Sequence, residues 1–254
     1  MISSHATHPG LVRQNNEDCI RVDDSLGIYL LADGIGGHNA GEVASALAVD
    51  TAYAVLRSNI AHTAIDGYIE LMVHAMHTSH WEINTKALTS SSFMRMGTTL
   101  VVVVLREDKA YIVNAGDSRC YLFQSELHSN SDPLIEREGK KFRQLTHDHT
   151  VGDQLLASGV SIGQIPKQHF RTLTQSVGCG NPPDPDFNIV EIKQGDLLLI
   201  CSDGLTDMLT DAEIETILAN GDANLDALAA DLIDAANANG GRDNISVVLV
   251  KSSP

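Results

Sequence analysis

"LLADGIGGH" occupies residues 30–38 and joins an apolar run to an acid, three glycines and a histidine. The run that leads into it, "IYLLA" at residues 28–32, has the composition of a buried strand. Asp33 follows that run directly, and the glycines after it remove the side chains that would crowd the acid. The stretch therefore predicts a buried strand that delivers a carboxylate to the end of a sheet.

The same pattern recurs later in the chain. "LLLICSDG" at residues 197–204 is again an apolar run followed by an acid, Asp203, and a glycine. Asp117 in "NAGDSR" follows another apolar strand, and Asp243 in "GGRDNISVVLV" precedes the last one. A single Asp-Gly pair often does no more than form a turn. Several acids at strand ends instead predict a cluster of carboxylates, whose mutual repulsion and desolvation a divalent cation would relieve.

The candidate ligands are all oxygen donors, and none of them is a Cys or His at the spacing of a zinc site. Oxygen ligands favour a hard ion such as Mg²⁺ or Mn²⁺. The glycine after Asp33 would expose its own carbonyl as a further oxygen ligand. Arg13 lies five residues before Asp18, with Glu17 alongside. A guanidinium near such a site suits the oxygens of a phosphate, although an exposed surface arginine is the simpler interpretation of Arg13 alone.

Composition limits the class of protein. The chain has 254 residues, of which 43% are apolar, and its formal charge of −16 makes nucleic acid a poor partner. The longest apolar run, residues 100–105, is too short to cross a membrane, and "MISSHATHPG" does not resemble a leader sequence. We therefore expect an unanchored cytoplasmic protein. The four cysteines form no CxxC pair, so neither a disulfide nor a zinc site is predicted.

Apolar periodicity predicts three helices, and a capping pattern predicts a fourth. The periodic residues span 44–55, 65–83 and 225–236. In the fourth, Thr210 can cap the first turn, Glu213 can reach back to the cap, and Gly221 can end the helix. Strands are expected at residues 28–32, 98–105, 110–115, 120–123, 197–201 and 245–250. The short connection "REDK" at residues 106–109 predicts an antiparallel hairpin.

The order of these elements predicts the fold class. Strands cluster in the middle of the chain, with helix pairs before and after them, so we expect an α+β fold of antiparallel sheets covered by helices. Residues 1–254 contain no repeat, no low-complexity tract and no long linker, which favours a single domain.

An ordered set of short motifs resembles the type 2C, metal-dependent serine/threonine protein phosphatase family in its compact bacterial form. The motifs are "RQNNED", "ADGIGGH", "MGTT", "NAGDSR", "LTHDHT", "SVG", "CSDGLTD" and "GGRDNISVV", and together they span residues 10 to about 250. Each motif alone is weak, whereas the whole ordered set is specific. The resemblance implies two packed antiparallel β-sheets flanked by helix pairs, a four-layer αββα sandwich. It also implies a dinuclear Mn²⁺ or Mg²⁺ site in a cleft at one sheet edge.

The resemblance also assigns metal ligands. Asp33 resembles the ligand that bridges two metals, Gly34 the carbonyl ligand, and Asp203 and Asp243 the other carboxylates. Asp117 matches the acid that, with Asp203, holds a third and weaker metal in bacterial members. Two Mn²⁺ or Mg²⁺ ions per chain are therefore implied, with a third bound weakly.

Other positions match residues around the metals. Glu17 and Asp18 match acids that hold metal-bound waters, and Arg13 matches the phosphate-binding arginine. Many eukaryotic members carry a histidine, assigned as the general acid, where this chain has Ile35. His38 matches a histidine frequent in bacterial members and is the replacement candidate. The alternative is that His38 orients the loop or a metal-bound water.

The activity implied is hydrolysis of phosphoserine and phosphothreonine in proteins by a metal-bridging water, with no phosphoenzyme intermediate. The implied partners are phosphorylated proteins and a cognate bacterial serine/threonine kinase, whose action the enzyme would reverse; we expect a monomer with no membrane or nucleic-acid partner. The alternative is a catalytically dead module that binds phosphoproteins. The presence of Asp33, Asp203 and Asp243 favours the active enzyme.

Two groups of histidines have simpler interpretations. The segment of about 150–170 resembles the mobile flap of the family, and His147 and His149 just before it are expected to shape it. His74, His77 and His80 share a helical spacing, but no acid or cysteine joins them, so they are predicted to lie on a solvated face.

Overall fold

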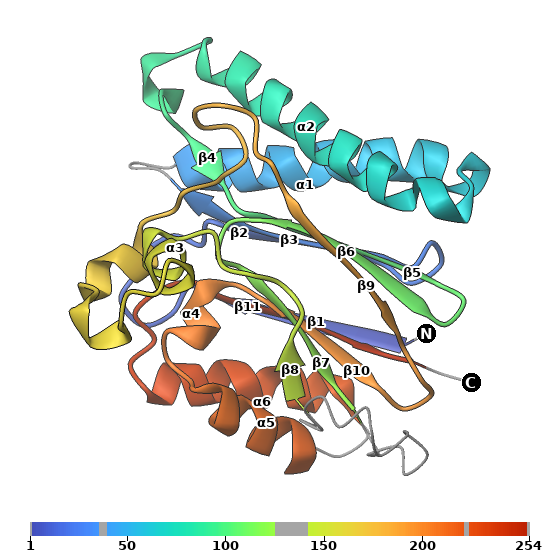
Figure 1. Cartoon of the computed structure of the whole chain (residues 1–254), viewed down its shortest axis with the longest axis vertical. Coiled ribbons are helices and arrows are strands. Elements are labelled where there is room, and N and C mark those ends of the chain that lie inside the picture. The colour runs from blue at the N-terminus through green and yellow to red at the C-terminus, as the bar shows by residue number, and fades with distance from the viewer. Residues whose placement is uncertain (1, 36–39, 125–141, 221–223, 253–254) are drawn as a thin grey trace.

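The computed structural model describes residues 2–35, 40–124, 142–220 and 224–252, and it contains two antiparallel sheets. The first sheet has the order β1 (Ile2–His8), β11 (Ile245–Lys251), β10 (Leu197–Cys201), β7 (Arg119–Phe123) and β8 (Phe142–Gln144). The second has the order β2 (Asp18–Asp23), β3 (Ile28–Ile35), β5 (Leu100–Arg106), β6 (Lys109–Ala115) and β9 (Asp186–Glu191), with β4 (Gly97–Thr98) paired to β3. The sheets lie face to face (Figure 1).

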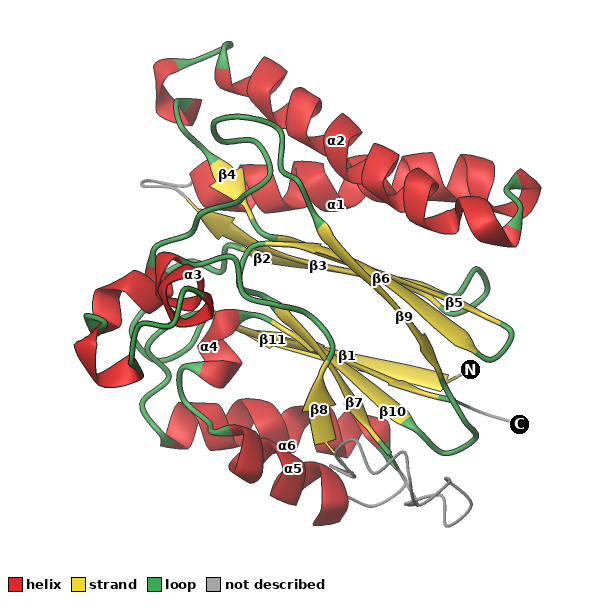
Figure 2. Cartoon of the chain, in the orientation of Figure 1, coloured by secondary structure: helices red, strands yellow, loops and turns green. Residues whose placement is uncertain are grey.

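Helix pairs cover the outer faces of the two sheets (Figure 2). The pair α1 (Ala40–Asn59) and α2 (Tyr68–Ala87) lies on the second sheet, and the pair α5 (Asp211–Asn220) and α6 (Leu225–Ala238) lies on the first. Shorter elements are α3 (Val151–Ala157), α4 (Asp203–Thr206) and the 3₁₀ turns Ile60–His62, Ile65–Gly67, Ser91–Phe93, Ile162–Gln164 and Lys167–Arg171. Within the described ranges, no helix combines the length and the hydropathy that a membrane span needs.

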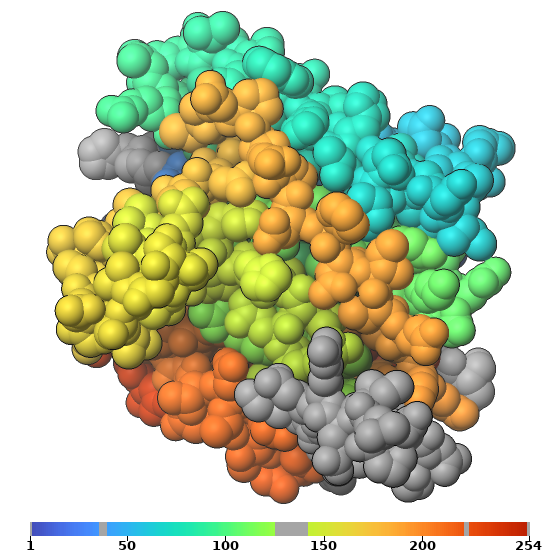
Figure 3. Space-filling view, in the orientation of Figure 1, coloured from blue at the N-terminus to red at the C-terminus, as the bar shows by residue number. Residues whose placement is uncertain are grey.

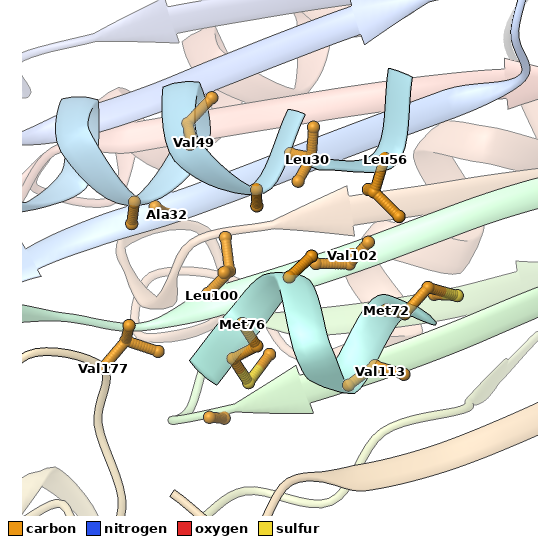
Figure 4. Close-up of a cluster of buried hydrophobic side chains, with 14 of the residues drawn as sticks. Leu30, Ala32, Val49, Leu56, Met72, Met76, Leu100, Val102, Val113 and Val177 are labelled. Atoms are coloured by element: carbon orange, nitrogen blue, oxygen red, sulfur yellow. The ribbon is translucent and has the colours of Figure 1, made fainter. Parts of the chain in front are cut away.

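The layers enclose three apolar cores, which explains why the predicted strands are continuous apolar runs. Side chains alternate along β3: Leu30 faces α1 and α2, whereas Leu31 faces the other sheet. Figure 4 shows the core between the second sheet and the helix pair α1 and α2, to which Leu30 and Val102 of the sheet and Met72 and Met76 of α2 belong. Because both faces of β3 are buried, its apolar run ends only where the strand reaches Asp33.

The α+β sandwich predicted from the sequence is confirmed, and the six predicted strands and four predicted helices are all present. β5 and β6 form the predicted hairpin, and Thr210 and Glu213 form the capping box, with the Thr210 amide donating to Glu213 Oε2 at 2.8 Å. Gly221 lies outside the described residues. The strands that the prediction missed are β1, β2, β8 and β9, the four sheet edges. Edge strands are only partly buried, so their sequences lack a strong apolar signal.

Candidate functional site

Acids from both sheets meet at one end of the sandwich. Asp33 lies two residues before the end of β3 and opposite Asp18 of β2 in the strand register. Asp203 follows β10 as the first residue of α4, and Asp243 lies just before β11. With the exception of Asp18, these residues line a pocket of about 610 Å³, together with Asp117 from the β6–β7 connection. Arg13, Glu17 and Gly34 also line this pocket, which we call the acid pocket.

Two glycines let backbone segments approach closely beside the acids. A Cβ at Gly34 would lie 2.3 Å from the carbonyl oxygen of Gly41, at the start of α1. A Cβ at Gly204 would lie 1.9 Å from the carbonyl oxygen of Asn244. Any side chain at these positions would push the acid-bearing strand ends apart. The Asp-Gly pairs are therefore explained by close packing of the backbone at the site.

The backbone of Asp33 is fixed by its neighbours on the next strand. Its amide donates to Thr99 Oγ1 at 2.9 Å, and its carbonyl accepts from the Thr99 amide at 2.9 Å. Thr98 Oγ1 also donates to that carbonyl at 2.8 Å. The two threonines belong to "MGTT", so this motif positions Asp33 rather than contributing a charged group of its own.

Ser202 and Asn244 hold the segment that carries Glu17 and Asp18. Ser202 Oγ donates to Asp18 Oδ2 at 2.8 Å, which ties β2 to the end of β10. The amide of Glu17 donates to Asn244 Oδ1 at 2.8 Å, which ties the segment before β2 to the start of β11. Both residues are buried. Neither residue was predicted to have a role, although each is adjacent to a predicted ligand and that adjacency was the available signal.

The crowding of carboxylates changes their protonation. Burial, followed by the charges of Asp18 and Asp203, raises the pKa of Asp33 well above its ordinary value. Burial and then the charges of Asp117 and Asp243 likewise raise the pKa of Asp203. Burial is also the main cause that raises the pKa of Asp18 and of Asp117 to about 6. Asp33 and Asp203 therefore lack a compensating positive charge.

The donor set fits a hard cation. Oδ1 of Asp18 and Oδ1 of Asp203 are buried, and neither accepts a hydrogen bond from the described residues. Buried carboxylate oxygens of this kind are costly unless a proton or a cation satisfies them. Within the same ranges, no three His, Cys, Asp or Glu side chains converge closely enough to hold an ion as they stand. The residues thus fit a cation by their chemistry and unmet bonds, and some side chains must move to enclose it.

Asp243 is the side chain whose present contacts differ most from the predicted role. Its Oδ2 accepts from Arg13 at 2.7 Å, and its Oδ1 accepts from the amide of Asn244 at 2.9 Å. The predicted phosphate-binding arginine is thus paired with a predicted metal ligand. A cation bound by Asp243 would replace the guanidinium at Oδ2 and leave Arg13 available for an anion.

The structure adds basic residues that the sequence analysis missed. Arg95 and Arg171 line the acid pocket, and Arg171 pairs with Asp207 at 2.5 Å. Arg171 directly follows the predicted flap, and Asp207 is the last residue of the "CSDGLTD" motif, so the motifs were a signal for both residues. Arg95 directly precedes the "MGTT" motif, and that adjacency was its signal. His38 lies outside the described residues.

His149 links the predicted flap to the loop that carries Asp117. It is buried, its amide donates to the carbonyl of Gly116 at 3.0 Å, and its Nδ1 accepts from the Gly116 amide at 3.2 Å. The next residue, Thr150, caps α3 through the amide of Asp153. His149 thus holds the loop before Asp117 as well as the start of the segment of about 150–170.

One histidine prediction was wrong. His80 is fully buried, and its Nδ1 accepts from the Gly178 amide at 3.0 Å, which joins α2 to the segment before β9. His77 Nε2 bonds the carbonyl of Pro183 at 2.9 Å, and only His74 is exposed. The prediction failed because a histidine that no acid or cysteine joins can still be buried when neighbouring groups satisfy its ring nitrogens.

The chain is similar to known proteins over nearly its whole length. The family model described as Protein phosphatase 2C matches residues 4–249. The serine/threonine phosphatase stp of Listeria innocua is 33% identical over 259 residues, which cover 99% of this chain and 96% of that protein. The structure of the serine/threonine phosphatase PstP/Ppp of Mycobacterium tuberculosis has a TM-score of 0.82 and 28% identity, and the match covers 100% of this chain and 99% of that one. A structure of the PstP catalytic domain in complex with two manganese ions has a TM-score of 0.81 and 28% identity. That match covers 100% of this chain and 98% of the other.

Proposed function

This chain belongs to the protein phosphatase 2C family, and we propose that its acid pocket is the metal centre of a protein serine/threonine phosphatase. The enzyme is metal-dependent and hydrolyses phosphoserine and phosphothreonine in proteins. The observation that carries this assignment to the acid pocket is the unmet demand for positive charge at Asp18 and Asp203, whose Oδ1 atoms are buried without partners. Nothing observed favours the catalytically dead alternative.

In this proposal Asp33 would hold both of two cations, and Asp203, Asp243 and the carbonyl of Gly34 would complete their protein ligands. The raised pKa values of Asp33 and Asp203 support it, because carboxylates that repel one another gain most from a shared cation. When bound, the cations lower the pKa of a coordinated water, which supplies the nucleophile, and polarise the phosphate.

The remaining residues bind and orient. Glu17 and Asp18 hold waters of the metal centre, and Ser202 keeps the Asp18 carboxylate in place by its 2.8 Å hydrogen bond. Arg13, once released from Asp243, donates to the phosphoryl oxygens, for which its planar guanidinium is suited. His38 donates a proton to the leaving serine or threonine oxygen.

The finer assignments belong to the same proposal. The ions are Mn²⁺ or Mg²⁺, and a third, weaker ion is held between Asp117 and Asp203, each of which raises the pKa of its neighbours in the pocket. Residues 1–254 form one domain, with the segment of about 150–170 as its flap. The enzyme is a bacterial, cytoplasmic signalling protein that acts as a monomer and reverses a serine/threonine kinase.

Hydrolysis assays test the function directly. The protein, stripped of metal, should release no phosphate from p-nitrophenyl phosphate or from phosphothreonine peptides, and added Mn²⁺ or Mg²⁺ should restore both reactions. A chelator should stop them again, because ions held by oxygen ligands exchange readily. Full activity of the stripped protein would overturn the proposal.

A further inference from the structure

A second hollow shares Arg95 with the acid pocket. It has a volume of about 430 Å³ and lies at the end of α2 and in the loop that follows. Its lining includes three large exposed apolar side chains: Trp81, 58% exposed, Leu88, 89% exposed, and Met94, 66% exposed. We call this hollow the apolar groove. Figure 3 shows that the loop after α2 (blue-green) and the flap (yellow) lie on the same side of the molecule, at the left of the view.

Exposed apolar side chains gathered in one hollow are typical of a binding surface. Trp, Met and Arg are among the residues enriched at the centres of protein interfaces. The wall of the groove is also held in place from behind. The ring of Trp81 meets the ring of His80 edge to face, with centroids 5.2 Å apart, and His80 is fixed by the Gly178 amide at 3.0 Å. A preformed wall costs little entropy when a ligand binds.

Arg95 connects the two hollows. Its φ of +62° is rare for a residue with a side chain, and backbone strain of this kind is concentrated at binding sites. Its guanidinium forms no ion pair or hydrogen bond with the residues that the structure describes, whereas Arg13 and Arg171 are both paired with acids of the acid pocket. Arg95 therefore remains available to a ligand that spans both hollows.

We propose that the apolar groove binds an apolar side chain of the phosphoprotein substrate, close in sequence to the phosphorylated residue. The inference rests on the proposed function, because the phosphorylated residue must enter the acid pocket. One side chain lines both hollows, so an extended substrate needs only about three residues, at roughly 3.3–3.6 Å each, to pass from one to the other. This continuity with the acid pocket favours the substrate as occupant over a second copy of the chain.

Fluorescence gives a readout that is independent of turnover. Trp81 is the one tryptophan of the chain and lies in the groove. Two peptides carry a non-hydrolysable phosphonate analogue of phosphothreonine, one with leucines at the three positions on each side of it and one with serines at those positions. With Mg²⁺ present, the leucine peptide should move the emission of Trp81 to shorter wavelength, because it removes the indole from water, and the serine peptide should not. An unchanged spectrum at concentrations that inhibit p-nitrophenyl phosphate hydrolysis would overturn the proposal.

Steady-state kinetics of variants then test whether the apolar side chain of the substrate binds in the groove. The double variant Leu88→Ser, Met94→Ser should lower kcat/KM for the leucine-flanked phosphopeptide by about 10-fold, the effect of losing one buried apolar side chain. It should leave the serine-flanked peptide and p-nitrophenyl phosphate unchanged. Ile65→Ser, which removes an exposed apolar side chain just before α2 begins, is the matched control. Equal losses on both peptides, or no loss on either, would overturn the proposal that the apolar groove binds the substrate. A wild-type protein inactive on p-nitrophenyl phosphate would instead overturn the proposed function.

Discussion

Asp203 carries a buried oxygen that accepts no hydrogen bond from the described residues, and the charges of Asp117 and Asp243 lie close enough to raise its pKa. Asparagine at this position would remove one charge from the cluster. We therefore expect Asp203→Asn to raise the melting temperature of the metal-free protein at pH 8 by about 2–4 °C, the shift that 1 kcal/mol produces in a domain of this size. Asp231→Asn, at an exposed position of α6, is the control and should change little. A lower melting temperature in Asp203→Asn would contradict the account.

The crowding of buried carboxylates around the acid pocket predicts how the free energy of unfolding depends on pH. The pKa of Asp18 and of Asp117 is raised to about 6 from an ordinary value of 3.8, so between these values the folded protein binds more protons than the unfolded chain. The free energy of unfolding must then fall as pH rises through this window. Urea titrations of the metal-free protein at pH 5 and pH 7 should show this loss, and Mg²⁺ should reduce it. Higher stability at pH 7 without metal would argue against the raised pKa values.

Arg13 is expected to act on substrate binding. In Arg13→Ala, KM for phosphopeptides should rise about 10-fold, the value of one hydrogen bond between charged groups, while kcat falls less. Inhibition by inorganic phosphate should weaken in parallel. Arg21→Ala, which removes the exposed Arg21–Asp50 pair, serves as the control. If phosphate inhibition is unchanged in Arg13→Ala, the arginine does not contact the phosphate.

His38 is tested by the leaving group. A serine or threonine alkoxide needs a proton as it leaves, whereas p-nitrophenolate departs readily without one. His38→Ala should therefore slow phosphopeptide hydrolysis by roughly 10²-fold and p-nitrophenyl phosphate hydrolysis much less. Equal losses on the two substrates would mean that His38 orders the loop or a metal-bound water instead.

At the scale of elements, the site depends on how closely the strand ends approach. Gly204 lies where β10 passes into α4, and a Cβ there would meet the Asn244 carbonyl before β11 at 1.9 Å. Gly204→Ala should thus lower the free energy of unfolding by about 1–3 kcal/mol, the usual cost of overpacking, and weaken metal binding through Asp203. Gly163→Ala is the control, because nothing lies within 4 Å of its added Cβ. Equal stability of the two variants in urea would contradict the close approach.

The sequence predicted the elements that are buried on both faces and missed those at the edges. The run "IYLLA" of β3 is apolar throughout because each side chain enters one of two cores. By contrast, β1 reads "ISSHATH", and its outer edge pairs with no other strand among the residues that the structure describes, so its local sequence carries little signal. α3 was missed because it is short and only Gly152 of it is fully buried.

At the scale of the whole molecule, the sandwich brings together acids that are far apart in the chain. The motifs predicted which strand ends carry acids, because an acid and a glycine after an apolar run are local features. They could not predict the pairing of Arg13 with Asp243, which are 230 residues apart. Nor could they predict the apolar groove, since the exposure of Trp81 and Met94 depends on which surfaces the folded chain leaves uncovered.

The central claim is that carboxylates of the acid pocket hold two divalent cations, and calorimetric titration of Mn²⁺ into the metal-free protein tests it most directly. The wild-type protein should bind two ions tightly, because the buried carboxylates of Asp33 and Asp203 lack a compensating positive charge. Asp33→Asn should lose this binding, because Asp33 is the shared ligand of the proposal, whereas Asp117→Ala should keep both tight ions and lose only a weaker one. Two tight ions retained in Asp33→Asn, or lost in Asp117→Ala, would contradict the account.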